Sequence, residues 1–287
     1  MPFASHDAVR IYWKLTGAED RPPLVLLNSI GTDMSVWEPC IAGLSRFFRI
    51  LRIDMRGHGA SDVPDGDYAL CDFANDVFAA MDAAGFGAAR IAGLSLGGMV
   101  AMQMALDMPE RVEALALVCT SATMDAAAWQ ARVEAVRDGG MQSIANLAME
   151  RFLSPGFADR NPDVAGSLRH ILLATDASGY AGAAAAIRDM QLRDRLGHIV
   201  CPSLVVTGTK DVSTPAIPHG QFLVESIGGA QQVALDCGHL APLEAPSALI
   251  AALTGFFLPN EREHGARETL YQAGMANRRR VLGDEWV

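Results

Sequence analysis

Short apolar runs alternate with amphipathic stretches along the first 120 residues. The run Leu24–Leu27 follows two prolines and is continuously apolar, which is typical of a strand buried on both faces of a parallel sheet. Similar runs occupy residues 48–54, 89–94 and 114–119, while residues 9–15 alternate as an edge strand does. Helical periodicity lies between them, at about 36–47, 72–84 and 99–106. Strands separated by helices predict a parallel, doubly wound α/β sheet.

This alternation stops between residues 122 and 196, where the pattern is helical, as at 126–137 and 141–152, and is broken at Gly139, Pro155 and Pro162. The segment is far longer than one crossover connection needs, so we predict a helical lid inserted between two strands; ordinary crossover helices are the alternative. Strand patterns return at 203–207 and 231–235, and helical patterns at 217–227 and 246–257. The predicted organisation is a core of residues 1–121 and 197–258, a lid of residues 122–196, and a separate segment, 259–287.

Composition narrows the choice of protein class. The net charge of −10 and the pI near 5.1 argue against nucleic acid or an anionic membrane as partner. Five widely spaced cysteines without a C-x-x-C pair indicate neither a disulfide framework nor a zinc site, and they fit a reducing cytoplasm. The N-terminus lacks the basic and apolar regions of a signal peptide, and no apolar run reaches the ~18 residues of a membrane span. We therefore expect a soluble cytoplasmic protein.

The stretch around Ser95 carries the first candidate chemistry. An apolar strand pattern passes through Gly-Leu-Ser-Leu-Gly (93–97) into a helical pattern, which predicts a strand, a sharp turn and a helix. Small residues at Gly93 and Gly97 would let strand and helix approach closely and expose the serine hydroxyl. A G-x-S-x-G pattern is weak alone, since it also fits an ordinary glycine-rich turn.

Two further residues make the pattern specific. Asp211 and His239, like Ser95, each follow the C-terminal end of a predicted strand, the edge at which open α/β sheets place their sites. The order Ser, Asp, His along the chain matches the α/β-hydrolase order. In this triad, His239 would take the proton of Ser95 and Asp211 would orient the imidazole.

Each member has an alternative interpretation. Asp211 could cap a helix and His239 could be an ordinary loop histidine. Asp54 and Asp236 are alternative candidates for the acid, and His58 is an alternative candidate for the base. The N–H groups of Leu96 and Ile30 are the candidate donors to a developing oxyanion, because one follows the serine and the other lies in the turn after the strand 24–27.

Five segments together resemble the α/β-hydrolase family. They are L-L-N-S-I-G-T-D, D-M-R-G-H-G-A-S, G-L-S-L-G-G-M-V-A, V-V-T-G-T-K-D-V-S-T-P and C-G-H-L-A-P-L-E-A-P. The match covers essentially residues 9–258 and is most similar to the 3-oxoadipate enol-lactonases of aromatic catabolism. Asn28-Ser29, where many relatives carry His-Gly, is similar to the enol-lactonases, and the serine at 95 argues against haloalkane dehalogenases, which use aspartate there.

In the predicted lid, Trp129 and Arg132 resemble a tryptophan and arginine of the enol-lactonases one helical turn apart. Three residues apart, both could face the pocket, with the indole against a flat ring and the guanidinium against a carboxylate. An amphipathic helix with Trp129 in the core and Arg132 solvated is the alternative, and Arg56 and Arg151 are other possible anion partners.

Residues 259–287 carry a separate resemblance. Their composition suggests a solvated linker and a short amphipathic helix, but Tyr271 to Asp284 looks like the opening of 4-carboxymuconolactone decarboxylase. Fusions of that enzyme with the lactonase are a known arrangement, so the resemblance implies a truncated fusion, or association with the decarboxylase, and no decarboxylase activity for this chain.

The resemblances imply a serine hydrolase that opens 3-oxoadipate enol-lactone to 3-oxoadipate, with a small anionic lactone as substrate and no metal or organic cofactor. A carboxylesterase, a C–C bond hydrolase or a cofactor-free perhydrolase could use the same triad. Outside enzymes, a ligand-binding receptor with slow turnover is the alternative.

Overall fold

The computed structural model describes residues 2–258, and these form an eight-stranded sheet. The strand order is β1-β2-β4-β3-β5-β6-β7-β8. The strands are β1 (Phe3–His6), β2 (Val9–Thr16), β3 (Pro23–Leu27), β4 (Arg49–Ile53), β5 (Ala89–Leu94), β6 (Val112–Val118), β7 (Ser203–Gly208) and β8 (Gln231–Leu235). Strands β4 to β8 and β3 pair in parallel, which confirms the α/β class.

The prediction that residues 9–15 form an edge strand was wrong. Strand β2 lies between β1 and β4 and pairs antiparallel with both, so β1 occupies the edge. The hairpin between β1 and β2 turns at Asp7 and Ala8, whose φ angles are 47° and 66°. Tight hairpin turns with positive φ usually carry asparagine or glycine, so this Asp-Ala pair gave no turn signal.

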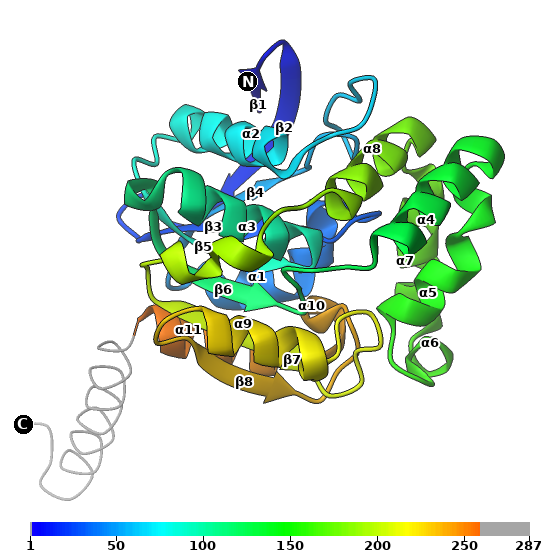
Figure 1. Cartoon of the computed structure of the whole chain (residues 1–287). Helices are drawn as coiled ribbons and strands as arrows, with labels where there is room; N and C mark the ends of the chain where they lie inside the picture. The colour runs from blue at the N-terminus through cyan, green and yellow to red at the C-terminus, as the bar shows by residue number, and fades with distance from the viewer. Residues whose placement is uncertain (1, 259–287) are drawn as a thin grey trace, which may run out of the picture.

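Helices cover both faces of the sheet (Figure 1). Helix α1 packs against α11 on one face, and α2 packs against α3 on the other, where α3 lies on β5, β6 and β3. The helices of the core are α1 (Glu38–Leu44), α2 (Leu70–Ala83), α3 (Leu96–Asp107), α9 (Gln221–Ser226), α10 (Ala241–Glu244) and α11 (Pro246–Phe257), with short helical turns η1 (Met34–Trp37), η2 (Pro109–Arg111), η4 (Arg193–His198) and η5 (Ala216–Gly220).

Between β6 and β7 the described chain contains helices and no strand. We call α4 to α8 the helical insertion; it stands to one side of the sheet, and α4 packs on α8 (Figure 1). Its elements are α4 (Ala126–Gly139), η3 (Met141–Ser143), α5 (Ala145–Phe152), α6 (Phe157–Arg160), α7 (Pro162–Ala174) and α8 (Ala177–Arg188).

Two predicted helices are interrupted. The pattern at 141–152 divides at Ile144 into η3 and α5, and the pattern at 217–227 begins with Ile217 in an extended conformation (φ −115°, ψ 122°). Residues 259–287, and with them the resemblance to a decarboxylase, lie outside the described residues.

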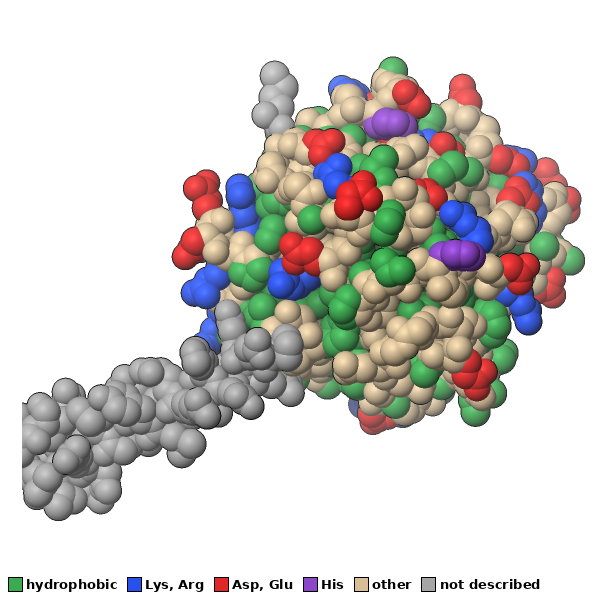
Figure 2. All heavy atoms as spheres, turned by 60° about the vertical axis from the view of Figure 1, so that its left-hand side comes forward, with side chains coloured by type: hydrophobic (Ala, Val, Ile, Leu, Met, Phe, Trp, Pro, Cys, Tyr) green, Lys and Arg blue, Asp and Glu red, His purple; other side chains and the backbone are tan. Residues whose placement is uncertain are grey.

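The surface carries both signs of charge. On the face shown in Figure 2, acidic and basic side chains are interspersed, with apolar side chains between them. No helix among residues 2–258 is long and apolar enough to cross a membrane.

One of the close backbone approaches of the core lies where β5 meets α3. A Cβ atom added to Gly93 would lie 2.2 Å from the carbonyl oxygen of Gly97, and one added to Gly97 would lie 2.5 Å from that of Leu27. Contacts this short with backbone atoms leave no side chain able to move aside. Glycine is therefore required at both positions for β3, β5 and α3 to meet.

We expect Gly93→Ala to lower the free energy of unfolding by about 1–3 kcal/mol, because the added methyl group overpacks a backbone contact. Gly87→Ala is the matched control, since a Cβ at this exposed position would meet no atom within 4 Å. Chemical denaturation followed by circular dichroism measures both variants. Equal stability of the two would show that the strand–helix contact can relax without cost.

Candidate active site

Ser95 occupies the turn between β5 and α3 in a strained conformation. Its φ of 54° and ψ of −115° lie outside the regions that non-glycine residues favour. Such conformations cost about 1–3 kcal/mol and persist only where the surroundings enforce them, often at functional sites. The backbone N–H of Ser95 donates to the carbonyl of Val118 (2.9 Å), which ties the turn to the end of β6.

His239 and Asp211 form a buried pair at the ends of β8 and β7. His239 Nδ1 lies 2.9 Å from Asp211 Oδ2, and the two side chains are 3% and 0% exposed. A carboxylate at Nδ1 favours the tautomer in which that nitrogen carries the proton and Nε2 is free to accept one. The pair is therefore arranged to keep His239 ready as a base.

Asp211 is held as an anion by the loop that follows it. Its Oδ1 accepts from the backbone N–H groups of Ser213 (2.7 Å) and Thr214 (3.1 Å), and its Oδ2 also accepts from the Thr214 hydroxyl (2.8 Å). Burial by itself raises the pKa of Asp211, but His239 and the Thr214 hydrogen bonds outweigh it and lower the pKa to about 2. Asp211 therefore does not cap a helix, because the N–H groups that donate to its carboxylate belong to loop residues, Ser213 and Thr214.

Ser95 and His239 line one cavity, but they are not hydrogen-bonded to each other among residues 2–258. Hydrogen bonds of this type are often long in a ligand-free enzyme and shorten when substrate binds. We call this space the serine cavity; it is lined by Ile30, Ser95, Met99, Met124, Trp129, Arg132, Ala148, Arg151, Phe152, Ile187, Ser213, Thr214 and His239.

Two backbone donors beside Ser95 are left without acceptors in the described part of the chain. The N–H of Gly31 donates to His58, that of Thr32 to Ser29, and those of Gly97 and Gly98 to Asn28 and Ser95. The N–H groups of Ile30 and Leu96 find no such partner. These are the two groups that the sequence indicates as donors to an oxyanion.

His58 and Asp54 brace the turn that contains Ile30. His58 Nε2 accepts the N–H of Gly31 (3.0 Å), and its Nδ1 donates to the carbonyl of Arg56 (3.0 Å). Asp54 accepts the N–H groups of Met34 (2.8 Å) and Ala60 (2.9 Å). Complete burial lowers the pKa of His58, so its imidazole is neutral. Neither residue lines the serine cavity, and both hold loops in place.

The remaining rivals lie away from the cavity. Asp236 is exposed, and it pairs with Lys210 (2.7 Å) rather than with a histidine. Arg56, an alternative anion partner, pairs with buried Asp76 (2.6 Å) and so is already neutralised.

Trp129 and Arg132 both reach the serine cavity from α4. The Arg132 guanidinium lies 4.8 Å from the centre of the Trp129 ring, and both side chains are half-buried. Arg151 joins them from α5, with Nη2 at 3.5 Å from the carbonyl of Val212. Within residues 2–258, neither arginine has a carboxylate within ion-pair distance. The cavity therefore contains two cations that have no carboxylate partner in the part of the chain that the structure describes.

The histidine loop is joined to the helical insertion by contacts that the sequence did not indicate. The ring of Phe152 stacks on His239 with a centroid separation of 6.3 Å and an interplanar angle of 8°. Glu244 accepts the N–H of Ser154 (2.7 Å) with one oxygen and that of Gly238 (3.0 Å) with the other. The contacts of Phe152 with His239 and of Ser154 with Glu244 join residues about 90 positions apart, so no local pattern could have revealed them.

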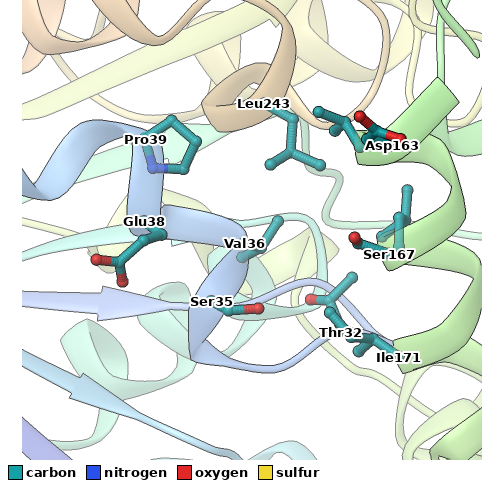
Figure 3. A pocket seen from close by; sticks show the side chains of 11 residues that line it. Thr32, Ser35, Val36, Glu38, Pro39, Asp163, Ser167, Ile171 and Leu243 are labelled. Atoms are coloured by element: carbon teal, nitrogen blue, oxygen red, sulfur yellow. The ribbon is translucent and has the colours of Figure 1, made fainter. Parts of the chain in front are cut away.

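The serine cavity opens toward a larger space. Its own volume is about 30 Å³, whereas the neighbouring outer cavity, which shares Trp129, Arg132 and Arg151 with it, has about 610 Å³. A third cavity of about 290 Å³ is lined by residues of η1, α1, α7 and α10, among them Val36, Ser167 and Leu243 (Figure 3). This third cavity is mostly apolar and contains none of the candidate catalytic residues.

Comparisons with known proteins identify the family of the fold. A model of the alpha/beta hydrolase fold matches residues 22–246. The chain is 35% identical over 241 residues to "3-oxoadipate enol-lactonase 2" of Acinetobacter baylyi, covering 84% of this chain and 90% of that protein.

Solved structures give the same result. A hydrolase from Pseudomonas aeruginosa superposes with a TM-score of 0.86 at 39% identity, covering 89% of this chain and 97% of that one. An enol-lactonase from Burkholderia xenovorans gives 0.87 at 33% identity, covering 89% and 99%. With this fold, these relatives and the Ser95 turn, the chain belongs to the α/β-hydrolase family, and it is a hydrolase.

Proposed function

We propose that this chain hydrolyses 3-oxoadipate enol-lactone to 3-oxoadipate, with Ser95 as nucleophile, His239 as base and Asp211 as the acid that orients it. The observation that carries the proposal is the pair of unneutralised arginines, Arg132 and Arg151, in the cavity that Ser95 and His239 line. An anionic ester or lactone fits such a cavity, and the enol-lactonase relatives support the choice of lactone.

The first half of the reaction opens the ring. Ser95 Oγ attacks the lactone carbonyl as its proton passes to His239 Nε2, while Asp211 stabilises the imidazolium through Nδ1. The N–H groups of Ile30 and Leu96 donate to the oxyanion, and one such donor is typically worth ~3 kcal/mol of barrier. The bond to the enol oxygen then breaks, and His239 returns the proton to it.

The second half releases the product. The released enol becomes the ketone of 3-oxoadipate, so the hydroxyl that could close the ring again is lost. Ring opening is therefore strongly downhill. Water then attacks the acyl group on Ser95, with His239 again accepting a proton. The hydroxyl of Ser95 is restored, and the free acid leaves.

The helical insertion supplies recognition in this proposal. Arg132 pairs with the carboxylate of the lactone, Arg151 adds a second positive charge, and the indole of Trp129 packs on the ring. With a volume of about 30 Å³, the serine cavity holds only two or three water molecules at ~10–15 Å³ each. Substrate therefore enters through the outer cavity, and the insertion must move as a lid to admit it.

A role in aromatic catabolism follows from the same substrate and is part of the proposal. Fusion to, or association with, 4-carboxymuconolactone decarboxylase is a separate prediction based on residues 259–287. The family match ends at residue 246 and gives it no support.

Replacing the nucleophile is the direct test of the mechanism. We expect Ser95→Ala to lower kcat for the lactone by at least about 10³-fold, because no other group can form the acyl intermediate. Loss of the ultraviolet absorbance of the enol-lactone measures the rate. Ser167→Ala, at the third cavity, is the control and should keep wild-type activity. A Ser95→Ala variant within tenfold of wild type would remove Ser95 from the mechanism.

Asp211 should support catalysis as a permanent anion. We expect Asp211→Asn to reduce kcat by about 10³-fold or more, since an amide cannot hold the required tautomer of His239. Because the pKa of Asp211 is about 2, this residue stays ionised above about pH 4 and adds no inflection to kcat/KM there. Profiles of kcat/KM from pH 4 to 9 test for this absence of an inflection in the wild type. For the loss in kcat, Asp236→Asn is the control, because Asp236 is exposed and pairs with Lys210. Equal losses in the two variants would contradict the assignment.

Recognition of the carboxylate can be separated from chemistry. We expect Arg132→Ala to raise KM for the lactone about 10- to 100-fold, the range of a charge-assisted hydrogen bond, with a small change in KM for p-nitrophenyl acetate. Arg137→Ala is the matched control, because this arginine lies on the same helix but pairs with Asp67 at the surface. Equal effects on the anionic and neutral substrates would make Arg132 structural.

A further inference from the structure

Tyr180 is a buried side chain that contacts the proposed recognition group. It lies on α8 and is 0% exposed. Its hydroxyl accepts a hydrogen bond from Arg132 Nη1 at 3.4 Å, and no acceptor for its own proton is found among residues 2–258. Buried tyrosine hydroxyls usually have a polar partner, so the contact with Arg132 is the one that explains a phenol here.

The ring of Tyr180 contacts the other half of the site. A Cβ atom at Gly31 would lie 3.1 Å from Tyr180 Cε2, so the ring packs directly against the turn that carries Ile30. One side chain thus touches both Arg132 and the turn with a candidate oxyanion donor.

The phenol contacts the arginine without neutralising it. Burial raises the pKa of Tyr180, while the nearby Arg132 and Arg151 lower it to a smaller extent. The hydroxyl is therefore uncharged at neutral pH. A carboxylate in the same place would form an ion pair with Arg132 and compete with an anionic substrate.

We propose that Tyr180 is a positioning residue, which orients Arg132 for the carboxylate of the substrate. The inference rests on the proposed function of Arg132. The guanidinium is held on its face by Trp129, at 4.8 Å from the ring centre, and at Nη1 by the Tyr180 hydroxyl. Two contacts of this kind reduce the freedom of a long side chain before substrate arrives, and its remaining N–H groups are left for the ligand.

The test removes the hydroxyl and keeps the ring. We expect Tyr180→Phe to raise KM for the enol-lactone about 3- to 10-fold, with kcat and the KM for p-nitrophenyl acetate within about twofold of wild type. Tyr68→Phe is the matched control: it also removes a buried hydroxyl's hydrogen bond, to the carbonyl of Pro64 at 2.7 Å, but its ring lies beside Arg56 and not Arg132. It should leave both KM values unchanged.

A double-mutant cycle shows whether Tyr180 acts through Arg132. If it does, adding Tyr180→Phe to Arg132→Ala causes no further rise in KM for the lactone. Two results would overturn the positioning role and leave the proposed function standing. In the first, Tyr180→Phe raises KM equally in the wild type and in Arg132→Ala. In the second, Arg132→Ala raises KM but Tyr180→Phe alone does not. If Arg132→Ala itself leaves KM unchanged, the proposed function of Arg132 fails first.

The ring contact gives a second measurement. Tyr180→Leu removes both the hydroxyl and the packing on Gly31, so we expect kcat to fall for the lactone and the neutral ester alike. A kcat effect in Tyr180→Phe equal to that in Tyr180→Leu would mean that the hydroxyl supports the whole fold of the site, and the positioning role would be lost.

Discussion

The close contact of β3, β5 and α3 is the constraint on which the candidate site depends. With no side chain at Gly93 or Gly97, the N–H of Gly97 comes within 2.9 Å of the carbonyl of Asn28. That hydrogen bond ties the first turn of α3 to the turn after β3. It thereby holds Leu96 close to the turn of Ile30, next to Ser95 in its positive-φ conformation. The proposed nucleophile and both proposed oxyanion donors therefore lie around one backbone contact.

The positive charge of Arg132 and Arg151, on the helical insertion, is the second feature on which the candidate site depends. Acidic residues outnumber basic ones, 33 to 23, and several buried or half-buried arginines, such as Arg52, Arg56 and Arg188, are paired with carboxylates. Arg132 and Arg151 are different, since their hydrogen-bond partners are a phenol and a backbone carbonyl. A cation in a partly buried cavity is costly without an anion. In an acidic chain, two such cations beside Ser95 are most simply explained by a ligand that brings the negative charge.

The sequence was sufficient for strands β2 to β8, because each follows from a local pattern, and Ser95, Asp211 and His239 follow the ends of β5, β7 and β8. Carboxyl ends of parallel strands meet at one edge, so residues far apart in the chain could be placed together. It was insufficient for β1, whose Asp-Ala turn is atypical, and for the breaks at Ile144 and Ile217. Phe152, Tyr180 and Glu244 were missed because their contacts join distant segments and depend on packing alone.

These missed contacts connect recognition with chemistry. Phe152 stacks on His239 from the end of α5, and Glu244 joins the residues just after α5 to the histidine loop. Arg132 lies on α4 and contacts Tyr180 on α8, whose ring packs on the turn of Ile30. The insertion is thus anchored both beside the proposed base and beside a proposed oxyanion donor. A movement of the insertion that admits the proposed substrate would have to release one of these contacts, and its return would restore the position of Arg132. Under the proposed function, the spacing between Arg132 and Ser95 would select substrates by the distance from their carboxylate to the scissile carbonyl.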